Sequence, residues 1–217
     1  MWYNLYRPKK GSEKMDNIDV KEQEKINQIY MKNEFALKML ETELDILLRS
    51  YAYEHKYNPV EHIKSRLKTK ESAFDKLEKK GYKITARNLI NHVHDMIGIR
   101  IVCSFLSDVY QVVELIKNSG QFEIKEEKDY IKEPKRTGYI SYHIIIKIPI
   151  NLSDKVEYVD AEIQVRTIAM DFWASLDHKL RYKLDDIPDD MDEEIYNCSF
   201  DIKALDEKMN HLHNNKC

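Results

Sequence analysis

Hydrophobic residues recur every three or four positions between residues 22 and 53, which is the spacing of one face of a helix. These apolar positions are Ile26, Ile29, Tyr30, Phe35, Leu37, Leu40, Leu44, Leu47, Leu48 and Tyr51. The pattern predicts a long amphipathic helix, or two helices that meet near Asn33. Residues 1–21 are polar and lack such a period, so we expect a loose arm before the helix.

Five shorter segments show the alternation or the continuous apolar run that is typical of β-strands. They are residues 62–68, 96–102, 121–126, 139–148 and 157–165. Helices are expected at residues 71–80, 87–93, 107–118 and 167–182, followed by an acidic helical segment at 190–213 that divides near 197–199 or continues. Ser107 or Asp108 is a candidate cap for its helix. Five strands mixed with helices predict an α/β or α+β domain between helical extensions.

One of these helices, residues 167–182, carries enough apolar residues for a core-facing side. We expect Ile168, Phe172, Trp173, Leu176 and Leu180 to point inward.

The composition sets the class of protein but not its partners. Hydrophobic residues make up 42% of the 217 positions, which is enough for a substantial core, and the net charge is only −3. The start of the chain has no apolar leader, and no stretch reaches the ~20 apolar residues of a membrane span. Cys103, Cys198 and Cys217 form no CxxC pair, so we expect reduced thiols, no zinc site and a cytoplasmic location.

Two isolated acids stand beside predicted strands. Asp95 precedes the strand at 96–102, and Glu162 lies within the strand at 157–165. Carboxylates on neighbouring strands can hold Mg²⁺ against triphosphate oxygens, as phosphoryl transfer requires. Sequence spacing alone equally allows two ordinary acids at a strand edge.

A basic set accompanies the two acids. Its members are Arg66, Lys68, Lys76 and Arg100, with Lys128, Lys135 and Arg136 further along the chain. Guanidinium and ammonium groups suit a polyphosphate, although a chain with 34% charged residues also has many such side chains on its solvated surface.

The segment from Gly138 to His143 is the most specific. Glycine permits close approach of the backbone, and the ring of Tyr139 can stack on a purine; a turn that leads into a strand is the alternative. His92, His94 and Asp95 resemble a metal-hydrolase motif, but no helical array of further His and Asp ligands precedes them. We therefore do not expect a hydrolase centre.

The order of these motifs resembles the small alarmone synthetases of the RelA/SpoT family, the single-domain RelQ/RelP type. The segments that carry the resemblance are residues 59–61, 66–68, 70–76, 94–101, 129–131, 138–143, 161–167 and 172–183. The resemblance implies an α+β fold, with a mixed five-stranded, nucleotidyltransferase-like sheet flanked by helices. It also implies a helical extension at 22–58, a synthetase domain at 59–185 and a C-terminal helical tail at 186–217.

The implied reaction moves pyrophosphate from ATP to the 3′-hydroxyl of GDP or GTP, with GMP as a further candidate acceptor, and releases AMP. Asp95 corresponds to the family's Mg²⁺ ligand, and Glu162 to the acid that shares the metal or takes the proton from the acceptor. The residues implied to bind ATP are Arg66, Lys68, Ser72, Lys76 and Arg100. Those implied to bind the guanine nucleotide are Lys128, Lys135, Tyr139, His143 and Gln164.

Other implications concern assembly and alternatives. The flanking helices resemble those through which small synthetases form tetramers, and no hydrolase domain is expected. Ile140 and Asp171 stand where many relatives have Arg and Asn, and His62 and Lys64 depart from the segment that binds an alarmone effector in some of them. Activation by the product is therefore not expected here. The alternative is a toxin-type relative that modifies tRNA 3′ ends or makes adenine alarmones.

Overall fold

The computed structural model describes residues 18–183 and 188–215. The helices are α2 (Val20–His55), α3 (Lys70–Lys79), α4 (Ala86–His92), α5 (Leu106–Asn118), α6 (Ile168–Lys183) and α7 (Asp189–Asn214). The strands are β1 (Val60–Leu67), β2 (Ile97–Cys103), β3 (Glu123–Asp129), β4 (Tyr142–Asn151) and β5 (Val156–Thr167). Residues 1–17 of the expected loose arm lie outside the described residues. Helix α2 begins at Val20, within the last part of the expected arm.

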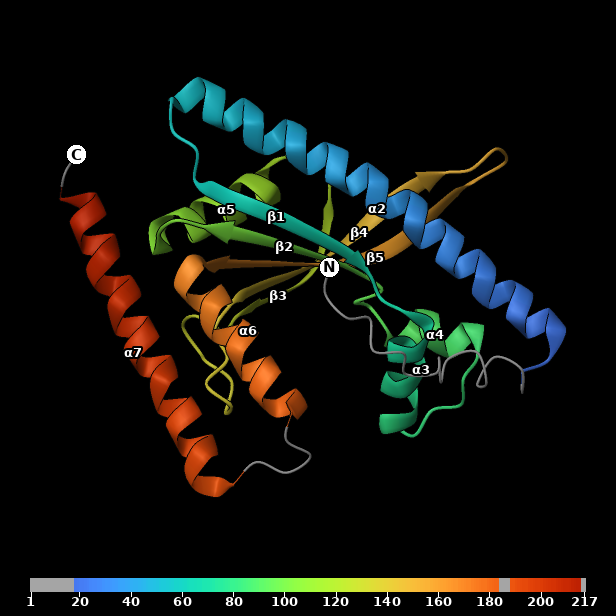
Figure 1. Cartoon of the computed structure of the whole chain (residues 1–217). Helices are drawn as coiled ribbons and strands as arrows, with labels where there is room; N and C mark the ends of the chain where they lie inside the picture. The colour runs from blue at the N-terminus through green and yellow to red at the C-terminus, as the bar shows by residue number, and fades with distance from the viewer. Residues whose placement is uncertain (1–17, 184–187, 216–217) are drawn as a thin grey trace, which may run out of the picture.

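The strands form a single five-stranded sheet in the order β1-β2-β5-β4-β3. Strands β2 and β5 run parallel, and the other neighbouring strands are antiparallel. This mixed sheet with helices confirms the expected α+β class. Figure 1 shows α2 lying across one side of the sheet, with α6 and α7 at one end and α3 and α4 at the other.

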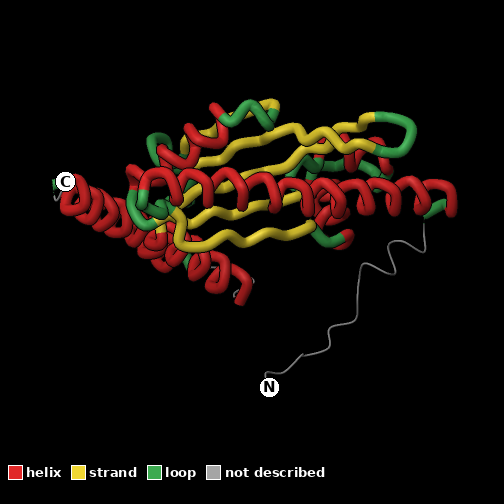
Figure 2. The backbone as a smooth tube through the Cα atoms, turned by 90° about the horizontal axis from the view of Figure 1, so that it is seen from above, coloured by secondary structure: helices red, strands yellow, loops and turns green. Residues whose placement is uncertain are grey.

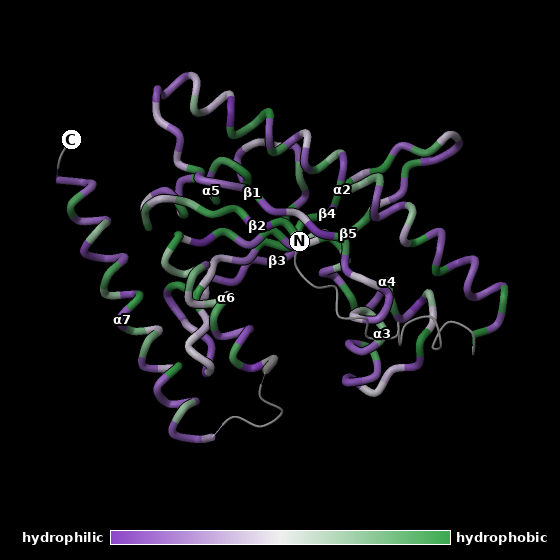
Figure 3. The backbone as a smooth tube through the Cα atoms, viewed as in Figure 1, coloured by the Kyte–Doolittle hydropathy of each residue, from purple (hydrophilic) through white to green (hydrophobic). Residues whose placement is uncertain are grey.

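One face of the sheet is apolar and covered by α2 and α5. Because side chains alternate across a strand, every second residue of the central strands faces these helices. The buried positions are Ile97, Ile99 and Ile101 of β2, Ile144, Ile146 and Ile148 of β4, and Ala161, Ile163 and Val165 of β5. The hydrophobic colour of these strands is visible beneath α2 in Figure 3. Burial of each large apolar side chain contributes about 1.5–3 kcal/mol.

Helix α2 is one continuous helix, so the alternative of two helices meeting near Asn33 is excluded. Its start is capped by the Asp19 side chain, which accepts a hydrogen bond from the Lys21 amide at 3.2 Å. Seen from above, it runs along the strands (Figure 2). Its buried residues Ala36, Leu40 and Leu44 belong to the core of the sheet, so this helix is an integral layer of the domain.

We expected five apolar side chains of α6 to point inward, and this prediction is wrong for three of them. Ile168, Phe172 and Leu176 are 52%, 59% and 40% exposed. Trp173 is buried as expected, and its indole N–H donates to the Ile195 carbonyl of α7 at 3.0 Å. Helix α6 packs along a narrow stripe against α7, β5 and β2, so these three apolar side chains remain at the surface of the chain.

Two details of the helix ends differ from expectation. Phe105 is the N-cap of α5 rather than Ser107 or Asp108, and the Asp108 carboxylate accepts the Phe105 amide N–H at 3.1 Å. The acidic segment forms one helix, α7, without a break at 197–199. Within the described residues, no helix is both long enough and apolar enough to cross a membrane.

The buried carboxyl group of Asp206 links helix α7 to the end of β5 through a hydrogen bond. The Thr167 hydroxyl donates to Asp206 Oδ2 at 2.6 Å and also accepts the Met170 amide N–H at the start of α6. Burial raises the pKa of Asp206 from 3.8 to about 6, although the bond from Thr167 opposes the shift.

This carboxyl group makes the stability of the fold depend on pH. It binds its proton more tightly in the folded chain than in the unfolded chain, so its contribution is complete below about pH 4 and is lost as the pH rises through about 6. A pKa change from 3.8 to about 6 corresponds to ~3 kcal/mol. We expect the free energy of unfolding of Asp206→Asn, measured in urea, to increase relative to that of the wild type as the pH rises from 4 to 7. The relative increase should reach up to this amount.

The exposed Asp201 on the same helix provides the matched control. Asp201→Asn should follow the wild-type pH dependence throughout this range. A parallel pH dependence of Asp206→Asn and the wild type would contradict the assignment.

Candidate active site

The two acids singled out in the sequence meet in one cavity. Asp95 lies just before β2, and Glu162 lies on β5, where it pairs with Gly98 of β2. Both line a cavity of about 180 Å³ on the face of the sheet opposite the apolar core. The remaining lining residues are Lys64, Ser65, Arg66, Gly98, Ile99, Arg100 and Gln164. The structure thus brings together both acids, the two arginines predicted to bind ATP, and Gln164.

Asp95 is held as an anion by two lysines. Lys68, just after β1, lies 3.1 Å from Oδ2, and Lys76 of α3 lies 2.8 Å from Oδ1. Burial opposes ionisation, but the hydrogen bond from Lys76 and the charge of Lys68 outweigh it, so the pKa of Asp95 lies below its ordinary value. The carboxylate is therefore ionised at neutral pH.

Glu162 is held by an imidazole and a side-chain amide instead. His143 Nδ1 lies 3.1 Å from Oε1, and Gln164 Nε2 donates to Oε2 at 2.8 Å. Burial again opposes ionisation, and the hydrogen bond and charge of His143 outweigh it, so the pKa of Glu162 is lowered. The neighbouring charge of Asp95 acts in the opposite direction and raises it. The two carboxylates are thus close enough to repel each other.

A chain of hydrogen bonds links Glu162 to a buried arginine that the sequence analysis did not select. Arg166 Nη2 donates to the Tyr139 hydroxyl at 2.7 Å, and this hydroxyl lies 2.9 Å from His143 Nε2. Since Arg166 can only donate and ionised Glu162 can only accept, a neutral His143 carries its proton on Nδ1. Arg166 therefore fixes both the tyrosine and the imidazole that faces Glu162.

Arg166 could have been found from the alternation of side chains along β5. Residues two apart on a strand share a face, so Glu162, Gln164 and Arg166 all point to the same side. Arg166 and Arg100 also share Asp171, whose Oδ1 lies 3.3 and 3.1 Å from them. The negative charge at position 171 is thus offset by two guanidinium groups.

The other predicted residues lie at the rim of the site. The Lys135 ammonium lies 4.8 Å from the ring centre of Tyr139, which is only partly exposed, and 4.5 Å from that of Tyr130. Lys128 pairs with Glu126 at 2.8 Å. Ser72 lies in the first turn of α3, where its amide donates to the capping Thr69 hydroxyl.

The donor set suits Mg²⁺, which binds oxygen ligands and in proteins commonly takes one or two carboxylates plus substrate phosphates. Asp95 and Glu162 supply two such groups. No cluster of three His, Cys, Asp or Glu side chains suited to a metal occurs within the described ranges. The site therefore fits a metal that completes its coordination with a bound polyphosphate. Arg100 Nε and Arg166 Nε are buried without a partner, which leaves donors for an anion.

Comparison with known proteins places this geometry in a family. Residues 65–187 match the model of the region found in RelA/SpoT proteins. The chain belongs to the RelA/SpoT family. It is 49% identical to GTP pyrophosphokinase YwaC of Bacillus subtilis over 176 residues, covering 81% of this chain and 84% of that protein. It is 32% identical to GTP pyrophosphokinase YjbM of the same organism, covering 82% and 83%.

Solved structures of family members share the fold. Small alarmone synthetase 2 from Bacillus subtilis has a TM-score of 0.77 and 45% identity, covering 87% of this chain and 97% of that one. Small alarmone synthetase 1 from the same organism, bound to its product pppGpp, has a TM-score of 0.79 and 30% identity, covering 87% and 96%. The resemblance inferred from the motifs is confirmed.

In this family member, α7 packs directly against the loop that carries Tyr139. Gly138 has φ +82°, and a Cβ atom built on it would lie 2.6 Å from Ser199 Oγ and 3.2 Å from Tyr196. The position therefore needs glycine for two reasons, its left-handed backbone and the close approach of α7.

We expect Gly138→Ala to destabilise the chain by about 2–4 kcal/mol, because strain and overpacking add. Activity should fall as well, since the loop that positions Tyr139 must shift. Unfolding in urea and steady-state kinetics measure the two effects.

Gly120 provides the control, because its φ is +69° but nothing lies within 4 Å of an added Cβ. Gly120→Ala should show the backbone strain alone, about 1 kcal/mol. Adding Ser199→Gly to Gly138→Ala should recover part of the loss. Equal destabilisation by the two glycine substitutions would count against a role for contact with α7.

Proposed function

We propose that this chain is a (p)ppGpp synthetase that transfers pyrophosphate from ATP to the ribose 3′-hydroxyl of GDP or GTP, with GMP as a further candidate acceptor. The observation that carries the proposal is the convergence of Asp95 and Glu162 in one cavity that Arg66 and Arg100 also line. Family membership supports the reaction class. We place the enzyme in the cytoplasm, as a synthetase without hydrolase activity that acts in the stringent response.

In the proposed step, the acceptor 3′-oxygen attacks the β-phosphorus of ATP in line with the leaving group. The bond from the β-phosphorus to the oxygen that bridges the α- and β-phosphates breaks. AMP leaves with that oxygen, and the proton of the 3′-hydroxyl passes to Glu162 or to water. Positioning and charge stabilisation supply most of the rate enhancement in such reactions.

On the donor side, Arg66 and Arg100 would stack on the adenine, because planar guanidinium groups bind well to aromatic faces. Lys68, Ser72 and Lys76 would bind the phosphates. Lys68 and Lys76 contact Asp95 in the free chain, so on ATP binding they would exchange part of that contact for phosphate oxygens. Asp95 and Glu162 would then hold Mg²⁺, which when bound offsets phosphate charge.

On the acceptor side, Tyr139 would stack on guanine once Lys135 moves from its ring to the acceptor's phosphates. His143 and Gln164 fix the Glu162 carboxylate, which lies ready to orient or accept the proton of the 3′-hydroxyl. A carboxylate with a lowered pKa is a weak base, so orientation by Glu162 contributes more than proton abstraction.

The conservative variants Asp95→Asn and Glu162→Gln test the proposal. Each keeps the shape of the side chain and removes its charge, so we expect kcat to fall by about a hundredfold or more while the fold persists. Alarmone formation from labelled ATP, with circular dichroism as the check on folding, measures this. Glu114→Gln on the exposed side of α5 is the matched control and should behave like the wild type.

The same assay separates the alternatives when GMP, GDP, GTP, ADP and tRNA are offered as acceptors. Label transferred only to ADP or to tRNA would replace the proposed function with that of a toxin-type relative. Wild-type turnover in either acid variant would refute the assigned active site.

We also propose that the chain forms a homotetramer. Phe200, Leu205, Met209 and Leu212 of α7 are each about half exposed, an apolar surface of the kind that marks a protein interface. Sedimentation should give the mass of four chains. Phe200→Glu should shift the distribution to smaller species, whereas Val156→Glu, at an equally exposed site on β5, should not. A monomeric wild type would contradict the proposal.

A further inference from the structure

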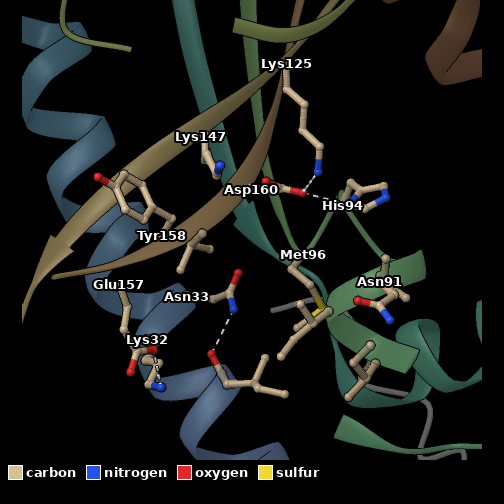
Figure 4. Close-up of a pocket in the computed structure, with 15 residues that line it drawn as sticks. Lys32, Asn33, Asn91, His94, Met96, Lys125, Lys147, Glu157, Tyr158 and Asp160 are labelled. Atoms are coloured by element: carbon tan, nitrogen blue, oxygen red, sulfur yellow. Dashed lines mark hydrogen bonds and ion pairs between the residues drawn. The ribbon is translucent and has the colours of Figure 1, made fainter. Parts of the chain in front are cut away.

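A second cavity, larger than the catalytic one, lies between the first half of α2, the segment from α4 to β2, and the far ends of β3, β4 and β5. Its volume is about 460 Å³, within the range of small-molecule sites. No residue lines both cavities. Figure 4 shows side chains from these elements directed around a common space.

The inner wall of this cavity is apolar except for one amide. Leu89, Val93 and Met96 are buried there, and Asn33 is only 5% exposed. Asn33 Nδ2 donates to the Ile29 carbonyl of its own helix at 2.8 Å. Because a carbonyl can only accept, the atom that faces it must be the nitrogen, and the amide oxygen is directed toward the cavity (Figure 4).

The amide oxygen of Asn33 is buried without a hydrogen-bond partner. Buried acceptors are satisfied in nearly all native proteins, and an unsatisfied one destabilises the chain unless a ligand or water supplies a donor. The inner end of the cavity therefore offers one acceptor, surrounded by apolar walls, to a molecule with an N–H group.

The outer end of the cavity is charged and more exposed. Lys125 donates to Asp160 at 2.6 Å, and Asp160 also contacts His94 at 2.7 Å, so this carboxylate already has two partners. Lys147, 38% exposed, has only a long contact of 3.6 Å to Glu123 and lies 5.3 Å above the ring centre of Tyr158. Its ammonium group is thus available to an anion.

Charge and shape together define the ligand. The lining lysines are Lys32, Lys125 and Lys147, against the acids Glu157 and Asp160, which leaves an excess of one positive charge. A planar base that donates an N–H at the inner end and carries one phosphate at the outer end meets both conditions. One phosphate, with a charge of about −1.5 to −2, exceeds this excess only slightly, whereas a triphosphate would exceed it several-fold.

We propose that this cavity binds a purine nucleoside monophosphate, with an N–H of the base donating to Asn33 and the phosphate lying at Lys147 and Lys125. The proposal concerns a site separate from the active site and does not depend on the reaction assigned there. Adenine and guanine both carry suitable donors, so the test uses AMP and GMP.

The test titrates AMP and GMP by calorimetry into the full chain, with the ATP site saturated by a non-hydrolysable ATP analogue. We expect one AMP per chain to bind under these conditions, and one GMP per chain in addition to any GMP bound at the acceptor site. Asn33→Leu replaces the acceptor with an apolar side chain of similar size, and should weaken binding about tenfold or more, the effect of losing one buried hydrogen bond. Lys147→Gln, which keeps the fold through its exposed position, should weaken it similarly.

Two controls locate the binding. Lys38→Gln removes a lysine that neither lines the cavity nor pairs with a lining residue, and should change nothing. Tyr139→Ala should leave this binding intact because Tyr139 belongs to the active site. Loss of binding in Tyr139→Ala but not in Asn33→Leu would assign the nucleotide to the acceptor site and overturn the proposal.

Further arms with adenosine and with inorganic phosphate test both halves of the ligand. Each should bind more weakly than AMP. Equal binding by phosphate alone would overturn recognition of the base, and absence of mononucleotide binding would mean a water-filled cavity. Alarmone synthesis by Asn33→Leu is measured separately. Loss of mononucleotide binding with normal synthesis concerns this cavity alone, whereas absence of synthesis in the wild type concerns the proposed function.

Discussion

The parallel pairing of β2 with β5 is the constraint on which the molecule depends. Because the two strands are neighbours in the middle of the sheet, their side chains alternate in step between an apolar face and a polar face. Ile97, Ile99 and Ile163 face α2 and α5 and hold the strands in register. The same register places Glu162 beside Gly98 and close to Asp95. A shift by one residue would bury the acids and expose the core.

The two acids tolerate each other's charge because each has its own partners. Asp95 is neutralised by two lysines, whereas Glu162 is stabilised by the imidazole of His143 and the amide of Gln164. This asymmetry suits a site that takes up an anionic substrate. Ammonium groups can transfer to phosphate oxygens, while the imidazole and amide keep Glu162 fixed through the reaction.

Helix α7 connects the far end of the chain to the acceptor side of the site. It contacts Gly138 through Ser199, and it contacts the end of β5 through the bond between Thr167 and Asp206. Thr167 directly follows Arg166, the residue that holds Tyr139 and shares Asp171 with Arg100. If subunits of an oligomer contact the exposed side of α7, only α7 itself separates that interface from the residues that position the acceptor.

The helices, the five strands and, through the order of the motifs, the family could all be predicted from the amino-acid sequence. Local periodicity suffices for most of these because most elements carry their own apolar pattern, although β3 contains only one apolar residue. Asp95, Glu162, Arg66 and Arg100 stand in contiguous motifs. Properties that depend on contacts between distant segments became visible only in the folded chain. Arg166 gained its role from Tyr139 and Asp171, and Phe172 stayed exposed because α6 packs along a narrow stripe. The cavity at Asn33 exists only where five separate segments meet. Such properties follow from which surfaces come together, and a one-dimensional pattern does not specify that.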